Sequence, residues 1–165
     1  MKTQIGVIGS KDISSGNVLD LALKVGREIA RTGAILVCGG LTGVMEASAK
    51  GAKEAGGTTI GIIPGNVKSE ANSFIEIVIA TGIGYARNTI VATTSDAVIV
   101  IAGGSGTLSE AAFALNMGKP VIALKGSGGI ADLIANREID GKLVLSASSP
   151  VEAVRLGVEK ASLLT

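Results

Sequence analysis

The chain has 165 residues, 47% of them hydrophobic, which is enough for one domain with a sizeable core and argues against disorder. It contains no histidine and one cysteine, which excludes Ser-His-Asp and Cys-His nucleophiles, histidine-ligated metals and an internal disulfide. The net charge of +1 comes from 15 basic and 14 acidic residues, without the basic stripe and stacking aromatics that nucleic-acid binding needs.

In chain order, short β-branched runs alternate with amphipathic helical stretches. Apolar residues from Val18 to Ile29 recur at the spacing of a buried helix face, and residues 97–101 form the uninterrupted apolar run of a strand buried on both faces. The last helix has a clear start, with Ser149 as N-cap, Pro150 as first residue and Glu152 completing a capping box. The pattern predicts, in order, strand 5–8, helix 18–29, strand 34–37, helix 41–55, strand 58–63, strand 74–79, helix 85–94, strand 97–101, helix 107–117, strand 120–124, helix 129–135, strand 143–145 and the last helix.

Strands that alternate with helices indicate βαβ units and a parallel sheet. We therefore predict an α/β, Rossmann-like, doubly wound sheet of about seven strands, with helices on both faces, forming a single domain over residues 1–165. Such folds bind ligands beyond the carboxyl ends of the strands, near the switch in strand order.

Neither the N-terminus nor the apolar stretches predict export or a membrane. The first apolar stretch is broken by Lys11 and Asp12, unlike a signal peptide, and the longest uncharged stretch, residues 97–109, is too short and glycine-rich to span a bilayer. Cys38 is unpaired, as is usual in a reducing compartment. We expect a cytoplasmic protein that contacts no membrane.

Glycine is the most informative residue, with 24 copies, about twice its usual share of roughly 7%. Glycine clusters follow four of the predicted strands and so meet at one edge of the sheet, where glycine permits close approach of a ligand and helix N-termini favour phosphate. A tight turn needs glycine for geometry alone, but four clusters at one edge favour a phosphate or nucleotide cleft. The clusters are Gly9-Ser10, Gly39-Gly40-Leu41-Thr42-Gly43, Gly103-Gly104-Ser105-Gly106-Thr107 and Gly126-Ser127-Gly128-Gly129.

These loops do not match the common nucleotide motifs. No Gly-Lys-Ser/Thr follows any of them, which excludes a Walker A loop. The acidic residue that holds a ribose at the end of the second strand is missing, because Cys38, Gly39 and Gly40 occupy that place. A conventional NAD dehydrogenase is therefore not expected.

Glu110 and Arg87 are the candidate reactive residues. Glu110 follows Thr107 by three positions, so it either closes a capping box or faces the phosphate-binding mouth, where it could act on a ribose hydroxyl or a water. Arg87 precedes the strand at 97–101 and either forms a solvated cap or salt bridge, or clamps a phosphate and offsets charge in a transition state. Both alternatives stay open for each residue.

Three segments together resemble the lonely-guy family of phosphoribohydrolases, whose members are often mislabelled as lysine decarboxylases. They are Arg87-Asn88, the strand and loop from Asp96 to Glu110, and the glycine-rich turn from Gly39 to Met45. The resemblance covers roughly residues 5–124 and implies a Rossmann-like dimer that hydrolyses the N-glycosidic bond of a nucleoside 5′-monophosphate. It implies catalytic roles for Arg87 and Glu110.

The resemblance also assigns the phosphate to residues 103–107, and together with the other glycine-rich loops this predicts a set of residues that contact the phosphate or nucleotide. That set is Gly9, Ser10, Gly39, Gly40, Gly43, Met45, Asn88, Gly103, Gly104, Ser105, Gly106 and Thr107. We expect no metal and no resident cofactor.

The chain departs from the family signature at three positions. Ala102 stands for its proline, Asn88 for its lysine and Glu46 for a glycine. These changes are similar to a neighbouring branch, that of the molybdenum cofactor carrier protein, which binds its phosphorylated pterin without turning it over. Two functions therefore remain, a phosphoribohydrolase and a carrier, both with a small phosphorylated ligand. A true lysine decarboxylase is rejected, because no lysine has the setting of a Schiff base.

The predicted dimer has two candidate helices for its interface. Helices 85–94 and 107–117 carry Ile90, Val91, Phe113 and Leu115, which either form a contact between copies of the chain or pack on the sheet.

Overall fold

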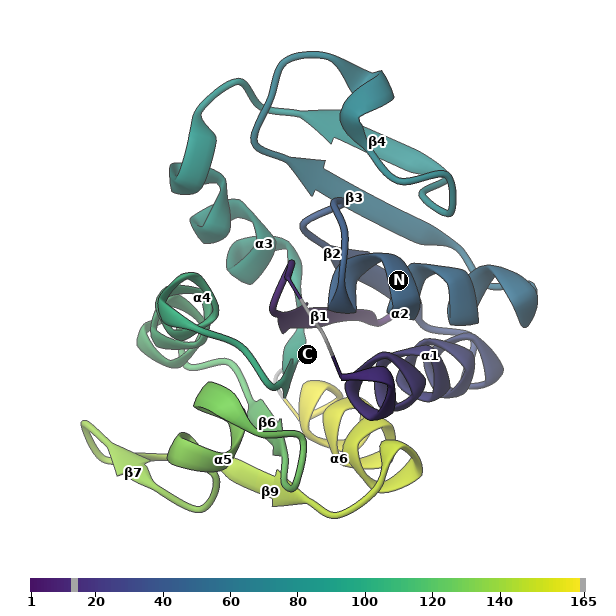
Figure 1. Cartoon of the computed structure of the whole chain (residues 1–165). Coiled ribbons are helices and arrows are strands. Elements are labelled where there is room, and N and C mark those ends of the chain that lie inside the picture. Colours follow the sequence, from purple (N-terminus) through teal and green to yellow (C-terminus); the bar gives the residue numbers. More distant parts are fainter. Residues whose placement is uncertain (13–14, 164–165) are drawn as a thin grey trace.

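A computed structural model describes residues 1–12 and 15–163 and contains a parallel sheet with helices on both faces (Figure 1). The seven strands lie in the order β4-β3-β2-β1-β5-β6-β9, and every pair of neighbours is parallel. The chain therefore has the predicted α/β, Rossmann-like fold. The strands are β1 (Gln4–Gly9), β2 (Ile35–Cys38), β3 (Thr59–Ile63), β4 (Ile77–Ala80), β5 (Ala97–Ile101), β6 (Val121–Leu124) and β9 (Leu145–Ala147).

The helices form two layers that enclose the sheet (Figure 1). One face is covered by α1 (Gly16–Arg31), α2 (Val44–Glu54) and α6 (Pro150–Ala161), and the other by α3 (Asn88–Thr94), α4 (Ser105–Asn116) and α5 (Gly129–Ile134). In residues 1–12 and 15–163, no helix is long and apolar enough to cross a membrane.

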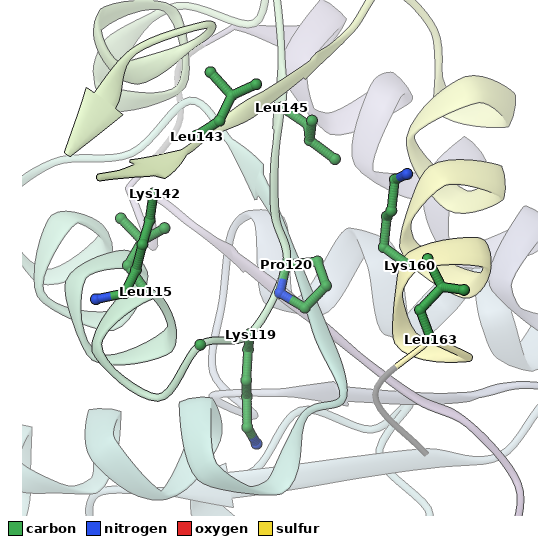
Figure 2. A pocket seen from close by; sticks show the side chains of 9 residues that line it. Leu115, Lys119, Pro120, Lys142, Leu143, Leu145, Lys160 and Leu163 are labelled. Atoms are coloured by element: carbon green, nitrogen blue, oxygen red, sulfur yellow. The ribbon is translucent and has the colours of Figure 1, made fainter. Parts of the chain in front are cut away.

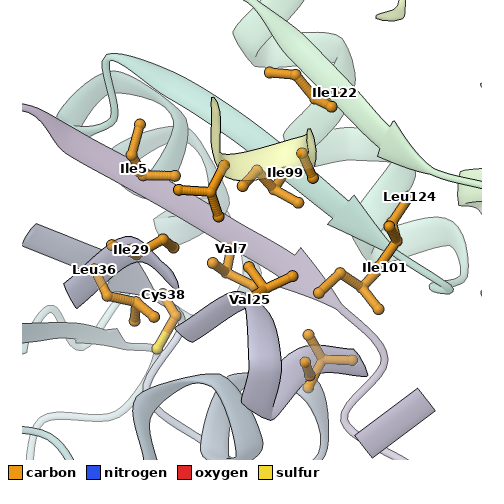
Figure 3. Close-up of a cluster of buried hydrophobic side chains, with 14 of the residues drawn as sticks. Ile5, Val7, Val25, Ile29, Leu36, Cys38, Ile99, Ile101, Ile122 and Leu124 are labelled. Atoms are coloured by element: carbon orange, nitrogen blue, oxygen red, sulfur yellow. The ribbon is translucent and has the colours of Figure 1, made fainter. Parts of the chain in front are cut away.

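The central strands are buried on both faces because their apolar residues alternate between two cores. In β5, Ile99 and Ile101 join the core beneath α1, α2 and α6, whereas Val98 and Val100 join the core beneath α3, α4 and α5. Figure 3 shows side chains of the first core, contributed by neighbouring strands and by α1. This is why residues 97–101 read as a continuous apolar run.

The order of the strands places a switch point between β1 and β5. From β1 the chain moves through β2 and β3 to the edge strand β4, then returns to β5 and continues to β6 and β9 on the other side. The loops that follow β1 and β5 therefore leave the sheet in opposite directions, and a crevice forms between them.

Several boundaries differ from the predicted ones. The fourth strand is Ile77–Ala80 instead of 74–79, because the Asn72 side chain accepts from the Phe74 N–H and turns the chain before the strand begins. The last strand of the sheet is Leu145–Ala147 instead of 143–145, because Leu143 pairs with Glu138 in a separate antiparallel pair, β7 (Glu138–Ile139) and β8 (Lys142–Leu143).

The starts of two helices bear on the capping patterns in the sequence. Ser149 caps α6 as expected, accepting from the Glu152 N–H at 3.2 Å. Of the two alternatives for Glu110, the capping box with Thr107 is ruled out, since α4 begins earlier, with Gly104 as its N-cap. Thr107 lies in the first turn and Glu110 in the second, too far along the helix to close a box.

Candidate functional site

A cleft with a volume of about 990 Å³ opens at the carboxyl ends of β1, β2 and β5. Its walls come from the loops after β1 and β2, from the 3₁₀ turn η2 (Gly84–Arg87) and from α3 and α4. This is the position beside the switch point where doubly wound folds bind ligands. The cleft is large enough for a nucleotide-sized molecule.

The N-terminus of α4 opens into this cleft without a side-chain cap. Its N-cap is Gly104, and Ser105, Gly106 and Thr107 of the first turn line the cavity. The first N–H groups of an α-helix have no partner within the helix and carry a partial positive charge. This arrangement favours an anion at the start of α4.

The loop before α4 has a constrained shape. Gly103 has φ +100°, and a Cβ at this position would lie 2.5 Å from the Thr107 side chain, so the loop needs glycine there. Ala102 also has a positive φ, +50°, which is uncommon for a residue with a side chain. Its N–H donates to Ser127 Oγ at 2.8 Å.

The fourth glycine cluster supports this loop from behind. The Ile130 N–H donates to the Gly103 carbonyl and the Ala131 N–H to the Ala102 carbonyl, both at 3.0 Å. None of Gly126, Ser127, Gly128 and Gly129 is part of the cleft wall. Of the four glycine clusters, three contribute to the cleft and the fourth holds one of them in place.

Arg87 and Glu110 meet at the floor of the cleft. Arg87 Nη1 donates to Glu110 Oε1 at 3.2 Å and to Asn88 Oδ1 at 3.0 Å. Each side chain is 9% exposed, so this is a buried ion pair, in contrast to the other salt bridges among the described residues, which are partly or largely exposed. Arg87 Nε is also buried and has no partner among the described residues.

Gly39 makes room for the Arg87 guanidinium. A Cβ on Gly39 would lie 2.5 Å from Arg87 Nη2 and 2.7 Å from its Cζ, distances that real side chains do not reach. The guanidinium therefore packs directly against the backbone that follows β2. This close approach explains why a glycine stands where dinucleotide-binding proteins have an acidic residue.

Burial sets the protonation of the two acidic groups near this arginine. Burial raises the pKa of the Glu110 carboxyl from 4.5 to about 7, and the positive charge of Arg87 opposes the rise. Burial also raises the pKa of the Cys38 thiol to about 12, so this thiol is neutral at physiological pH and is not a nucleophile. Glu110 can therefore exchange a proton near neutrality, whereas Cys38 cannot.

The loops after β1 and β2 are tied to each other and to the segment before β4. The Val44 N–H donates to the Ser10 carbonyl at 3.0 Å. The Asn72 amide donates to the carbonyls of Gly40 at 3.2 Å and Leu41 at 2.8 Å. The polar segment 66–73 is thus anchored at its end to the wall of the cleft.

The structure brings most of the predicted residues together. Gly40, Gly43 and Gly103 belong to the same loops but are not part of the cleft wall. Those that line the cleft are Arg87, Glu110, Gly9, Ser10, Gly39, Met45, Asn88, Gly104, Ser105, Gly106 and Thr107.

Sequence reasoning missed two aromatic residues of the cleft, Tyr85 and Phe113. The chain has only three aromatic residues, and these two stand close in sequence to Arg87 and Glu110 respectively. That proximity was a usable signal. Lys11, Asp12 and Pro64 also line the cleft and were not assigned.

A second hollow of about 350 Å³ lies at the opposite edge of the sheet, beside the amino ends of β6 and β9 (Figure 2). Leucine, proline and lysine side chains surround it, among them Leu145, Pro120 and Lys119. Lys119 Nζ donates to the carbonyls of Ala92, Thr93 and Ser95, and so caps the end of α3. None of the predicted site residues lines this hollow, so the candidate site is the larger cleft.

The fold defines a Rossmann-like protein with a large cleft beside the switch point of its sheet. The model of the SLOG cluster4 family matches residues 2–154, and the chain belongs to this family. An uncharacterised protein of Archaeoglobus fulgidus is 50% identical over 122 residues, which are 74% of this chain and 80% of that protein. The cytokinin riboside 5′-monophosphate phosphoribohydrolase of Mycobacterium tuberculosis is a homologue, 40% identical over 96 residues, which are 56% of this chain and 51% of that enzyme.

The solved structures that resemble almost the whole chain include two molybdenum cofactor proteins. The molybdenum cofactor binding protein of Rippkaea orientalis is 39% identical, with a TM-score of 0.87, and the match covers 100% of this chain and 99% of that one. The molybdenum cofactor carrier protein of Chlamydomonas reinhardtii is 37% identical, with a TM-score of 0.85, covering 98% and 99%. The similarity to both groups predicted from Arg87-Asn88 and the glycine-rich loops is thereby confirmed.

Proposed function

We propose that the cleft binds a small phosphorylated, nucleotide-type ligand, with its phosphate at the N-terminus of α4 and beside Arg87. The observation that carries this proposal is Arg87 Nε, a buried cationic donor that has no partner among the described residues and belongs to a residue lining the same cavity as the uncapped first turn of α4. A buried donor without a partner is costly unless a ligand satisfies it. An arginine next to free backbone N–H groups has the chemistry that recognises phosphate.

Glu110 supports hydrolysis as the first candidate reaction. In this proposal water attacks C1′ of a nucleoside 5′-monophosphate, the N-glycosidic bond breaks, and the products are the free base and ribose 5-phosphate. The Glu110 carboxylate takes a proton from the attacking water, the leaving base takes a proton from solvent, and Glu110 later returns its proton to solvent. A carboxyl with a pKa of about 7 has the protonation balance that a general base needs near neutral pH. Arg87 offsets the negative charge of the phosphate beside the reacting sugar.

Carriage without reaction is the second candidate. Two proteins that are similar over almost the whole chain bind or carry the molybdenum cofactor, whereas the phosphoribohydrolase matches over about half of each chain. The departures Asn88 and Ala102 lie in the two segments that would hold the phosphate. In this proposal the same loops and Arg87 retain a phosphorylated pterin, and no bond is broken.

One experiment separates the two candidates. The protein is incubated with a panel of nucleoside 5′-monophosphates, and free base and ribose 5-phosphate are measured for the wild type, Glu110→Gln and the matched variant Glu159→Gln, whose side chain is 51% exposed on α6. Hydrolysis predicts release that Glu110→Gln abolishes and Glu159→Gln retains. Binding without release, unchanged by Glu110→Gln, supports carriage. Absence of binding to every nucleotide and to a phosphorylated pterin overturns the proposal.

We also propose that the chain forms a homodimer through the outer surface of α3 and α4. Between residues 77 and 118 the charged side chains are Arg87, Asp96 and Glu110 only. Arg87 and Glu110 are paired in the cleft, and Asp96 accepts from the Gln4 N–H. The outer surface of both helices is therefore uncharged, as is typical of the centre of an interface between identical subunits.

A further inference from the structure

Asn88, the first residue of α3, is buried between the two helices that border the cleft. Its amide nitrogen donates to Ser109 Oγ at 3.0 Å and to the Gly106 carbonyl at 3.4 Å. Its amide oxygen accepts from Arg87 Nη1 at 3.0 Å. A single side chain therefore joins the arginine of the site to the first turns of α4.

These bonds leave Asn88 no donor for a ligand. An asparagine amide has two N–H groups, and both are directed at atoms of the protein. The remaining free position is a lone pair on the amide oxygen, which repels an anion. Although Asn88 lines the cleft, its chemistry toward a phosphate is unfavourable unless these bonds break.

The guanidinium of Arg87 depends on few acceptors. Its Nη1 is shared between Asn88 and Glu110, its Nε has no partner among the described residues, and Gly39 limits its movement on one side. If the Asn88 side chain is removed, Glu110 remains the acceptor for Nη1, and the pair can shift toward that carboxylate. Arg87 then keeps its link to the second turn of α4 through Glu110, but it loses the link to the first turn that Asn88 makes through the Gly106 carbonyl.

We propose that Asn88 is a positioning residue, which holds Arg87 and the first turn of α4 in a fixed relation and does not itself contact the ligand. This inference rests on the proposed function, because the phosphate is expected between these two groups. It also accounts for asparagine at position 88, where the lonely-guy signature has lysine. A lysine would bring a further cation to the cleft, whereas asparagine links groups that are already there.

The first test needs no ligand. The pKa of the Glu110 carboxyl is measured by NMR titration of its carboxyl carbon in the wild type, in Asn88→Asp and in Asn116→Asp, a matched change at an exposed residue at the end of α4. Asn88→Asp places a second carboxylate on Arg87 Nη1, so the Glu110 pKa rises above its wild-type value. Asn116→Asp leaves it unchanged. An unchanged Glu110 pKa in Asn88→Asp overturns the inference, since Asn88 would then not contact this arginine.

The second test distinguishes positioning from direct contact by a double-mutant cycle with inorganic phosphate as the probe. Asn88→Ala is expected to weaken phosphate binding about tenfold in the wild-type background, because a charge-assisted hydrogen bond is lost. In the Arg87→Met background it has little further effect, because Asn88 acts through Arg87. Equal losses in both backgrounds show direct contact and overturn the inference. If the wild type binds no phosphate or nucleotide, the proposed function fails, while the titration of Glu110 still decides the role of Asn88.

Discussion

The residues of the site combine a buried ion pair with an incomplete set of hydrogen bonds. Removing a pair such as Arg87 and Glu110 from water costs free energy that its mutual attraction does not always recover, so burial of this kind is weak evidence for a stabilising role. Arg87 Nε adds a further cost, because it is buried without a partner. Both costs are consistent with the proposed role of Arg87 in ligand binding and give it no stabilising role by themselves.

The pH dependence of stability tests the Glu110 carboxyl directly. Between pH 4.5 and about 7 the folded chain holds a proton on Glu110 that the unfolded chain has lost. The free energy of unfolding therefore falls as the pH rises through this interval, by an amount on the order of a few kcal/mol. We expect urea unfolding to show this fall in the wild type and a flatter profile in Glu110→Gln. The chain has no histidine to titrate in this interval. Parallel profiles for the two proteins would contradict the raised pKa.

Among the elements, α4 shows how a local sequence pattern can mislead about where a helix starts. The run Thr107-Leu108-Ser109-Glu110 has the pattern of a capping box, yet the helix starts at Ser105. Thr107 packs on Gly103 and Glu110 reaches Arg87, so contacts from outside the helix overrule its local signal. Local patterns succeed at α6, where Ser149 caps the helix and Glu152 accepts from Ser148.

The conformation of Ala102 leads to a prediction about the loop before α4. Ala102→Gly is expected to stabilise the protein by about 1 kcal/mol, because glycine has no Cβ to strain at positive φ. Ala102→Pro is expected to be strongly destabilising, because proline fixes φ near −65° and lacks the N–H that donates to Ser127. Both effects are measured by urea unfolding.

Ala112→Gly, at an exposed position inside α4, is the matched control. It should destabilise by about 1 kcal/mol, opposite in sign to Ala102→Gly, because glycine is a poor helix former. Equal destabilisation by both substitutions would show that Ala102 is not strained. Ala102 stands where the lonely-guy signature has proline. Its φ of +50° is one that proline cannot adopt, so the loop of this chain differs in shape from a loop with proline at this position.

At the scale of the whole molecule, the proposed dimer depends on which apolar side chains of α3 and α4 are exposed. Val91 and Leu115 from the predicted interface are instead buried in the core of the chain, while Ile90 and Phe113 are only partly buried. Met117 remains 41% exposed at the end of α4. A second copy could therefore cover fewer apolar side chains than the sequences of the two helices contain, because two of them already pack in the core.

Sedimentation at micromolar concentration is expected to give a dimer for the wild type. Met117→Glu places a charge on the uncharged surface and should shift the equilibrium to the monomer, because a buried unpaired charge at an interface is costly. Val151→Glu, on α6 at the opposite face of the sheet, should leave the dimer intact. A monomeric wild type contradicts the proposal.

The sequence by itself determined the architecture and the edge of the sheet where the candidate site lies. The alternation of apolar runs and amphipathic stretches has a period that follows from backbone geometry, and glycine clusters after β1, β2 and β5 mark the edge of a parallel sheet. Arg87 and Glu110 were also identified before the fold was known, but only as separate candidates with two interpretations each.

The tertiary structure alone decided what these residues do to each other. Glu110 pairs with Arg87 across 23 positions of sequence, and the pair is buried because α3 packs against α4. The raised pKa of Glu110 comes from desolvation, which depends on the atoms that surround the carboxyl and not on its neighbours in the chain. The bridging role of Asn88 and the support of Ala102 by Ser127 have the same origin. Such contacts join distant segments, and a single sequence carries no local signal for them.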